Sequence, residues 1–205
     1  MPLPERRFLL LLNGPVADLS LVKRLARRAQ AVMCADGGAK TAARLKVKPR
    51  FVVGDMDSLP SPLPYWKGTV YWCDFDEDRS DFEKALEFCS DIGWRRLWVA
   101  GALGGRLDHA LVNLALIERY SAAVDIELVD SGTARLLGKG KHRFPLPSGS
   151  LFSLLALGEA SVTLTGARYP LEKTILKPGS RGLSNRAEGP VAVTVHSGRV
   201  WFIAP

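Results

Sequence analysis

The chain has 205 residues, a hydrophobic content of 47% and a formal net charge of +7. These values fit one large or two small packed domains and exclude a disordered or repetitive chain. No segment approaches the ~20 apolar residues of a membrane-spanning helix. The apolar run Phe8–Leu12 follows two arginines, but it is too short for a secretory signal and ends at a turn. We therefore expect a soluble, cytoplasmic protein that does not enter a membrane.

The positive charge favours anionic partners such as nucleotides. However, the basic residues at positions 23, 24, 27 and 28 fall in one predicted helix and are typical of a solvated face. No basic stripe with interleaved aromatic residues is present, so nucleic acid is not expected as a partner. The three cysteines, Cys34, Cys73 and Cys89, lack paired spacing, which argues against disulfides and zinc and predicts a reducing compartment.

The first two thirds of the chain alternate between short β-type runs and segments with helical periodicity. The predicted strands are Phe8–Leu12, Ala31–Cys34, Phe51–Val53, Val70–Cys73, Leu97–Ala100 and Ile126–Val129. The predicted helices are Ser20–Gln30, Gly38–Leu45, Ser80–Cys89 and Asp108–Tyr120. This alternation is typical of a mainly parallel sheet with helices on both faces, which is a three-layer, Rossmann-like α/β domain.

From about Ser131 the pattern changes to short β-type runs separated by glycine, proline and serine. The predicted strands here are Ser150–Ala156, Ser161–Leu164, Val191–His196 and Arg199–Ile203. Ser197-Gly198 is typical of a hairpin turn between the last two strands. Helical periodicity is missing from this part. We therefore predict an α/β domain at residues 1–132 and a smaller all-β domain at residues 133–205, with the boundary within Ser131–Gly140.

Two aspartates follow the third predicted strand, in Gly54-Asp55-Met56-Asp57-Ser58. Alternation along an extended segment would point Asp55 and Asp57 the same way. Two carboxylates held so close repel each other unless a cation lies between them. Oxygen ligands suit a hard ion, which makes Mg²⁺ with a nucleotide phosphate the natural candidate. The alternative is an acidic turn exposed to solvent, because so short a motif often occurs without a metal site.

Polar and glycine-rich turns also follow the first, second and fifth predicted strands. They are Asn13-Gly14, Asp36-Gly37-Gly38 and Gly101–Arg106. The carboxyl ends of parallel strands meet at one edge of a sheet, so all of these turns can line a single crevice. Glycines there let a phosphate approach the backbone at a helix N-terminus. Each turn taken alone is also an ordinary strand-to-helix connection.

A second acidic segment, Asp76–Asp81, precedes the third predicted helix. Ser80 and Glu83 form a capping box, so Asp81 lies in the first turn of that helix with a fixed direction. The predicted apolar face of the helix consists of Phe82, Ala85, Leu86 and Cys89. One acidic residue at a helix N-terminus is explained by compensation of the helix dipole, but this does not explain the several acidic residues of this segment. If the segment lies beside the two aspartates of the third strand, Asp81 would complete a magnesium site of three carboxylates.

The fourth predicted helix opens at Gly104–His109. Its predicted buried side consists of Leu107, Leu111 and Leu114. Arg106 can bind a phosphate through its planar guanidinium. Asp108 can accept a hydrogen bond from a substrate or can cap the helix. His109 is a candidate acid or base, although a histidine at a helix start more often has a structural role.

Five motifs appear in the order seen in thiamine pyrophosphokinases. They are Ala35–Ala39, Gly54–Ser58, Ser80–Leu86, Gly104–His109 and Ser184-Asn185. From about Leu9 to its C-terminus the chain therefore resembles this family. Met56 stands where Phe is common and Ser80 where Thr is common, and both keep the chemistry. Lys40 replaces a frequent Asn, which leaves the nucleotide contact there open.

The resemblance implies an α/β nucleotide-binding domain followed by a β-sandwich domain that binds thiamine and dimerises, in a homodimer with active sites at the subunit junction. It implies Mg²⁺-dependent transfer of the pyrophosphoryl group of ATP to the hydroxyl of thiamine, which gives thiamine diphosphate and AMP. Two rivals stay open from the residues: pyrophosphorylation of another alcohol such as a hydroxymethyl pterin, and a non-catalytic nucleotide sensor or RNA-binding protein.

The resemblance also implies roles for individual residues. The implied magnesium ligands are Asp55, Asp57 and Asp81. The residues implied near ATP are Asp36, Gly37, Ser80 and Arg106. The residues implied near thiamine are Asp108, Ser184 and Asn185. The implied catalytic residues are Asp55, Asp57, Asp81, Arg106 and Asp108. Tyr169 is a candidate for stacking on thiamine, although core packing is the more common role of such an aromatic.

Overall fold

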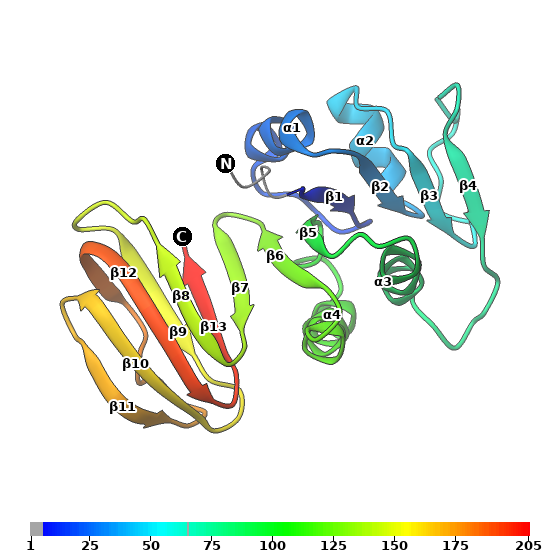
Figure 1. Ribbon diagram of the computed structural model, residues 1–205. Helices are drawn as coiled ribbons and strands as arrows, with labels where there is room; N and C mark the ends of the chain where they lie inside the picture. Colours follow the sequence, from blue (N-terminus) through cyan, green and yellow to red (C-terminus); the bar gives the residue numbers. More distant parts are fainter. Residues whose placement is uncertain (1–5, 65) are drawn as a thin grey trace. The chain divides into compact units, whose positions relative to one another are not determined.

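The computed structural model describes residues 6–64 and 66–205. It contains two compact units, Met1–Ser131 and Gly132–Pro205, and each is described by itself (Figure 1). In the part of the chain described, no helix is long and apolar enough to cross a membrane.

The ten elements predicted for the first unit are all present, with boundaries within two residues of those expected. Its strands are β1 (Phe8–Leu11), β2 (Val32–Ala35), β3 (Phe51–Gly54), β4 (Val70–Cys73), β5 (Arg96–Ala100) and β6 (Asp125–Val129). Its helices are α1 (Leu19–Arg28), α2 (Gly38–Leu45), α3 (Asp81–Asp91) and α4 (Leu107–Tyr120).

The strands of the first unit pair in the order β6-β5-β1-β2-β3-β4, and every pair is parallel. Figure 1 shows α1 and α2 on one face of this sheet and α3 and α4 on the other. All four residues of β1 are buried, because helices cover the sheet from both sides. Leu9 packs in the core with Val22 of α1, whereas Met33 of β2 contacts Cys89 of α3 through their sulfur atoms at 3.7 Å. The sequence pattern therefore predicted the elements and the parallel sheet of this unit correctly.

Helix α3 begins as expected, but its capping box is only half formed. Ser80 is the N-cap, and its Oγ accepts a hydrogen bond from the Glu83 N–H at 3.3 Å. The Glu83 carboxylate does not reach back to the cap; it forms an ion pair with Arg119 of α4 at 2.6 Å. The predicted apolar face of α3 is buried, so the helix sits on the sheet as the pattern indicated.

The predicted buried side of α4 is wrong. Leu107 and Leu111 are 73% and 60% exposed. The residues of α4 that are buried are Asn113, Leu116 and Ile117. The Asn113 side chain tolerates burial because its Nδ2 donates a hydrogen bond to the Ala102 carbonyl at 2.8 Å. The covered face of α4 thus differs from its apparent apolar stripe.

The second unit contains β-strands and no helix among its described residues. They are β7 (Thr133–Leu137), β8 (Gly140–Phe144), β9 (Leu151–Leu155), β10 (Ala160–Ala167), β11 (Leu171–Leu176), β12 (Asn185–Ser197) and β13 (Val200–Ala204). All their pairings are antiparallel, and they form two sets, β7-β13-β9 and β8-β12-β10-β11. The long strand β12 joins the sets, because Asn185 and Arg186 at its start pair with β9. One hydrophobic core includes residues from both sets.

Two expectations for this unit are corrected by the structure. Strands β7, β8 and β11 were not predicted, because charged and polar residues interrupt their apolar pattern. The hairpin predicted at Ser197-Gly198 is also wrong. The chain does turn there, with Gly198 at φ +73°, but β13 pairs with β7 and β9 instead of β12.

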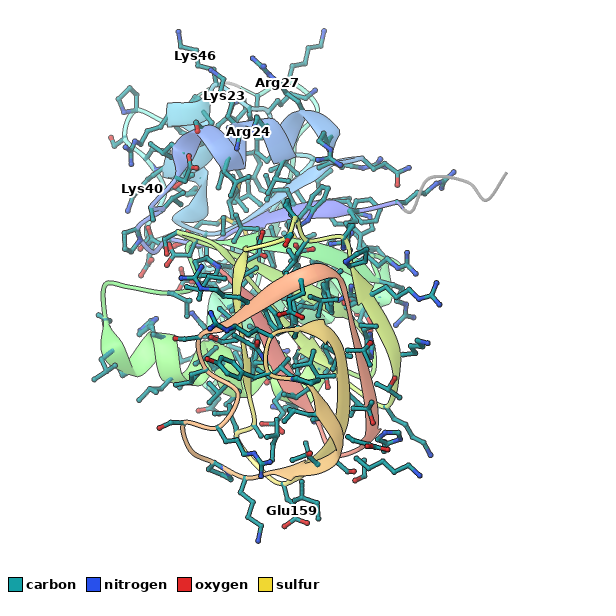
Figure 2. The ribbon with its side chains drawn as sticks, turned by 90° about the vertical axis from the view of Figure 1, so that its left-hand side faces the viewer. Lys23, Arg24, Arg27, Lys40, Lys46 and Glu159 are labelled. Carbon is teal, nitrogen blue, oxygen red and sulfur yellow. The ribbon has the colours of Figure 1, made fainter. Side chains whose placement is uncertain are left out.

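The positive charge of the first unit is concentrated between residues 16 and 50, mostly on α1 and α2. Nine of the 28 lysines and arginines but only two of the 21 acids lie between residues 16 and 50, so this stretch holds a net charge equal to the +7 of the whole chain. All nine basic side chains are exposed. Figure 2 shows Lys23, Arg27 and Lys46 extending outward from the layer of α1 and α2. The basic residues are therefore solvated, as predicted for α1, but they are less scattered than the sequence indicated.

Candidate active site

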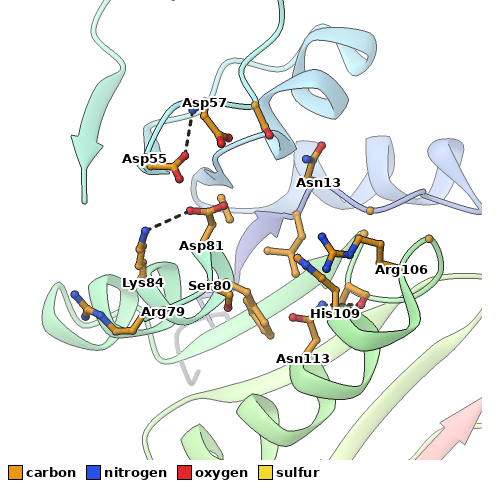
Figure 3. A pocket seen from close by; sticks show the side chains of 18 of the residues that line it. Asn13, Asp55, Asp57, Arg79, Ser80, Asp81, Lys84, Arg106, His109 and Asn113 are labelled. Carbon is orange, nitrogen blue, oxygen red and sulfur yellow. Dashed lines mark hydrogen bonds and ion pairs between the residues drawn. The ribbon is translucent and has the colours of Figure 1, made fainter. Parts of the chain in front are cut away.

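The turns predicted to share a crevice do meet at the carboxyl edge of the parallel sheet. The turns after β1, β3 and β5 line a pocket of about 590 Å³ together with the N-termini of α3 and α4 (Figure 3). At the end of β2, Ala35 lines this pocket, whereas Asp36, Gly37 and Gly38 do not. Close packing requires glycine at two of these turns. A Cβ on Gly38 would lie 2.0 Å from the Leu11 carbonyl oxygen. A Cβ on Gly54, which has φ +147°, would lie 2.8 Å from an Asp81 carboxylate oxygen. Gly54 thus allows carboxylates from separate elements to approach one another.

Four aspartates gather at this edge, and we call them the acidic cluster: Asp36, Asp55, Asp57 and Asp81. Asp36, Asp55 and Asp57 each offer a carboxylate oxygen, and these oxygens all lie within 4.8 Å of one another. The segment Asp55–Asp57 was expected to be extended, but it is not, because Met56 has φ +72°. Instead, the Asp57 N–H donates a hydrogen bond to Asp55 Oδ1 at 3.1 Å. The convergence was predicted correctly, but a tight turn produces it.

Asp36 is the most buried member of the acidic cluster, at 1% exposure, and follows β2 with φ +37°. Its Oδ2 accepts a hydrogen bond from the Ser58 N–H at 3.1 Å. Its Oδ1 is buried and has no hydrogen-bond partner. Burial, and then the nearby carboxylates, raise the pKa of Asp36. A buried acceptor without a partner is costly, which is why such an atom indicates a missing cation or donor.

Asp81 approaches the cluster from the first turn of α3, and Figure 3 shows its carboxylate facing Asp55 and Asp57. Burial and the neighbouring carboxylates raise the pKa of Asp81 to about 6. The opposing charge is Lys84, whose Nζ lies 3.8 Å from Asp81 Oδ1. The Lys84 side chain is only 3% exposed, and its Nζ donates a hydrogen bond to the Asp74 carbonyl at 2.8 Å. Sequence reasoning assigned Lys84 no role, because nothing local marks a lysine as buried.

The acidic segment before α3 differs from the cluster, and we call Asp74–Arg79 the Arg79 loop. Arg79 forms ion pairs with Asp74, Asp76 and Glu87. The Asp76 N–H donates to Asp74 Oδ1 and the Asp78 N–H donates to Asp76 Oδ1. These contacts keep the pKa of Asp76 below its ordinary value. The carboxylates of Asp74 and Asp76 are thus satisfied without a metal.

Arg106 and Asp108 lie at the mouth of the pocket and pair with each other. Arg106 Nε donates to Asp108 Oδ1 at 3.1 Å, and its Nη2 donates to Oδ2 at 2.5 Å. This pair, together with the His109 N–H, lowers the pKa of Asp108 to about 2. Both side chains are mostly exposed, so the pair can exchange one partner for a ligand. His109 also lines the pocket, within the same turn of α4.

The predicted residues Ser184 and Asn185 belong to the second unit. Asn185 is 3% exposed, and its side-chain amide is fully engaged with the backbone of Tyr169, through Nδ2 to the carbonyl at 2.8 Å and through Oδ1 from the N–H at 3.1 Å. Ser184 precedes it with φ +55° and is exposed. The Tyr169 ring is 60% exposed, so the core-packing interpretation of Tyr169 is wrong. Asn185 therefore orders the segment that presents this ring.

Fold and site together are typical of α/β proteins that bind nucleotides at the carboxyl edge of a parallel sheet. A family model described as "Thiamin pyrophosphokinase, catalytic domain" matches residues 22–141. A second, "Thiamin pyrophosphokinase, vitamin B1 binding domain", matches residues 141–200. These matches span well over half of the sequence, and the chain belongs to the thiamin pyrophosphokinase family. The resemblance inferred from its motifs is thus confirmed.

Individual relatives agree with the family models. Thiamine pyrophosphokinase 1 of Oryza sativa subsp. japonica is 29% identical, over 86% of this chain and 80% of that protein. Thiamine pyrophosphokinase 1 of Arabidopsis thaliana is 28% identical, over 84% of this chain and 77% of that protein. The crystal structure of thiamine pyrophosphokinase from Bacillus subtilis has a TM-score of 0.84 at 20% identity, over 97% of this chain and 98% of that one. The structural match supports the mixed α/β fold.

Proposed function

We propose that the acidic cluster holds Mg²⁺ and the phosphates of ATP during the reaction of the family. As a member of that family, the chain is a thiamine diphosphokinase, which transfers the pyrophosphoryl group of ATP to thiamine and releases AMP. We propose Asp55, Asp57 and Asp81 as the metal ligands, with Asp36 beside them. Mg²⁺ bound there would offset the negative charge of the phosphates.

One observation supports the metal assignment above all: carboxylates from β2, β3 and α3 converge with little countercharge. The set of donors contains only oxygen, which is the ligand type that a hard cation prefers. Asp36 Oδ1 is buried without a partner, and the raised pKa of Asp81 reflects repulsion from the other carboxylates as well as burial. A bound cation would relieve both conditions. The residues present therefore fit the metal that the family resemblance implies.

In the proposed reaction the thiamine hydroxyl oxygen forms a bond to the β-phosphorus of ATP. The bond from that phosphorus to the bridging oxygen of AMP breaks, and the hydroxyl proton passes to solvent or to a phosphate oxygen. Such a transfer depends on positioning and charge neutralisation more than on covalent participation by the protein. We therefore assign no strong base, and His109 keeps no catalytic role in the proposal.

Arg106 and Asp108 are proposed to work as a pair. In the structure Asp108 orients the Arg106 guanidinium at the mouth of the pocket. When a phosphate takes the place of Asp108, the planar guanidinium keeps two hydrogen bonds to oxygen. Asp108 is then free to accept a hydrogen bond from thiamine. Ser80 and Gly37, at the starts of α3 and α2, are proposed to lie near the phosphates because helix N-termini attract anions.

We propose that the second unit, predicted as residues 133–205, is a β-sandwich that contributes to thiamine binding. The exposed ring of Tyr169 supports this role, because a flat aromatic face attracts a cationic ring. Ser184 is the better candidate for direct contact, since the Asn185 amide is already engaged. A homodimer is also proposed. Its support is the exposed apolar face of α4, where Leu107, Leu111 and Val112 are at least 49% exposed.

The experiment that tests this function is product analysis. The purified chain is incubated with ATP, Mg²⁺ and thiamine, and the products are separated. The proposal expects AMP and thiamine diphosphate in equal amounts, and no AMP when a hydroxymethyl pterin replaces thiamine. ADP in place of AMP would refute pyrophosphoryl transfer, and turnover without a divalent metal would refute the magnesium assignment.

A further inference from the structure

A second pocket, of about 620 Å³, lies at the opposite edge of the parallel sheet in the first unit. Its walls come from the amino-terminal ends of β1, β3 and β5 and from the turn after α3. Four arginines from three separate stretches of sequence line it: Arg6, Arg50, Arg95 and Arg96. We call this cavity the arginine pocket.

The arginine pocket has the opposite charge to the acidic cluster. None of the described residues that line it has a carboxylate. Arg95 Nη1 lies 3.4 Å from Ser90 Oγ and from the Ala123 carbonyl, and the Arg50 guanidinium lies 5.5 Å from the Phe51 ring. These partners are neutral, so they leave the two positive charges uncancelled. Guanidinium groups that line one cavity repel one another, and an anion between them reduces that repulsion.

One wall of the arginine pocket is a rigid group of aromatic rings. Phe8 and Trp94 stack with their ring centres 4.1 Å apart and their planes within 7°. Phe51 meets Trp94 edge-on at 5.6 Å. Ile92, on the same wall, is 39% exposed. A ligand that fits this cavity therefore combines an anionic group for the arginines with an apolar, flat part for the wall.

The arginine pocket is distinct from the active site. Strands β1 and β3 have four residues each, and β5 has five. At about 3.3 Å per residue these strands separate the two pockets by roughly 13–17 Å. No residue lines both pockets. A ligand can occupy one while the other is in use.

We propose that the arginine pocket binds a phosphate ester of a planar ring, of the nucleoside monophosphate class. Arginine matches phosphate oxygens through two parallel hydrogen bonds, which lysine cannot do. The flat base packs against the wall at the exposed Ile92 and beside Phe51, whose ring also lies 5.5 Å from the Arg50 guanidinium. A cationic ring such as thiamine is a poor occupant, because the arginines repel it. This site goes beyond the proposed pyrophosphoryl transfer and does not depend on it.

The test is titration calorimetry of the full chain with AMP in EDTA, where no divalent metal can hold a phosphate at the acidic cluster. Three proteins are compared: wild type, Arg50→Ala/Arg95→Ala in the pocket, and Arg27→Ala/Arg44→Ala as a control with exposed arginines on α1 and α2. The proposal expects one AMP site in wild type and in the control, and at least about tenfold weaker binding in the pocket variant. Arg50→Lys/Arg95→Lys should lose part of the affinity, because it keeps the charge without the planar group.

Two further readouts separate this proposal from its alternatives. Inorganic phosphate should bind to wild type more weakly than AMP, since it has no ring for the wall. The pocket variant should keep the wild-type kcat, because neither arginine lines the active site. The proposal is overturned if wild type shows no saturable AMP binding, if both double alanine variants bind AMP equally, or if phosphate binds as tightly as AMP. If the arginines only balance the negative carboxyl ends of nearby helices, wild type would show no saturable AMP binding.

Discussion

The acidic cluster and the Arg79 loop are neighbouring, aspartate-rich parts of the first unit, but their charges are balanced in different ways. In the loop, one arginine and backbone N–H groups satisfy the carboxylates of Asp74 and Asp76. In the cluster, Asp36 Oδ1 has no partner and Asp81 has a lysine at 3.8 Å. The density of acids along the sequence is therefore a poor guide to a metal site. What distinguishes the cluster is that its carboxylates converge without being satisfied.

The largest effect is expected from a substitution in the cluster. Asp57→Ala should lower kcat by roughly 10²–10³-fold or more, because the lost charge acts on the transferring phosphates. Asp76→Ala, in the Arg79 loop, is the matched control. Asp76 also lines the pocket, but its carboxylate is paired with Arg79 and does not belong to the acidic cluster, so kcat should stay within about fivefold. Steady-state AMP production measures both, and circular dichroism checks that each variant is folded. If both variants lost kcat equally, the acidic cluster and the Arg79 loop would not differ in their contribution to catalysis.

Removal of the buried lysine should have the next largest effect. Lys84→Met leaves the Asp74 carbonyl without its donor and the cluster without its countercharge. We expect the free energy of unfolding to fall by about 1–3 kcal/mol. Added Mg²⁺ should recover part of this loss, because it supplies the missing charge.

Urea denaturation with and without Mg²⁺ makes this measurement. Lys177→Met is the control, since its ion pair with Glu159 is exposed and should contribute less than about 0.5 kcal/mol. If Lys84→Met is as stable as this control, the lysine does not balance the cluster.

The acidic cluster should also make the metal-free stability fall as the pH rises, which is opposite to the trend that the lowered pKa of Asp76 in the Arg79 loop produces. The pKa of Asp81 rises from 3.8 to about 6 on folding. Its protonated form is therefore favoured in the folded chain, so its stabilising contribution is complete below pH 3.8 and is lost as the pH rises through about 6. In EDTA, the unfolding free energy of wild type should fall across this range relative to that of Asp81→Asn. Parallel pH profiles for the two proteins would contradict the raised pKa.

The smallest effect is expected in the loop. Arg79→Ala leaves its acidic partners without their common countercharge, and we expect a small loss of stability, as for ion pairs that are open to solvent. Arg119→Ala removes a single exposed ion pair with Glu83 and should cost less. Thermal unfolding compares the two. A larger loss in Arg119→Ala would mean that Arg79 does not organise the loop.

The sequence predicted the first unit better than the second for a physical reason. Buried parallel strands such as β1 are continuous apolar runs that stand out from the helices between them. Strands such as β8, with Lys141 and Arg143, have one exposed face and resemble loops. For α4, the exposed Leu107 and Leu111 mimicked a core stripe, because a helical pattern does not reveal which face is covered.

The site was predictable where neighbours in sequence are neighbours in space. The proximity of Asp55 and Asp57 follows from their spacing, although the turn at Met56 does not. The burial of Asp36 and Lys84 depends on packing between elements far apart in the chain, which no local pattern contains. The Arg106–Asp108 pair was likewise missed, since each residue was assigned a separate ligand.

The most direct test of the metal site is Mn²⁺ binding followed by electron paramagnetic resonance, because Mn²⁺ prefers the same oxygen ligands as Mg²⁺. The full chain is titrated without substrates, alongside Asp57→Asn and the loop variant Asp76→Asn. We predict saturable Mn²⁺ binding that Mg²⁺ displaces in wild type and Asp76→Asn, and a loss of this binding in Asp57→Asn. Undiminished binding in Asp57→Asn, or its loss only in Asp76→Asn, would contradict the assignment of the metal to the acidic cluster.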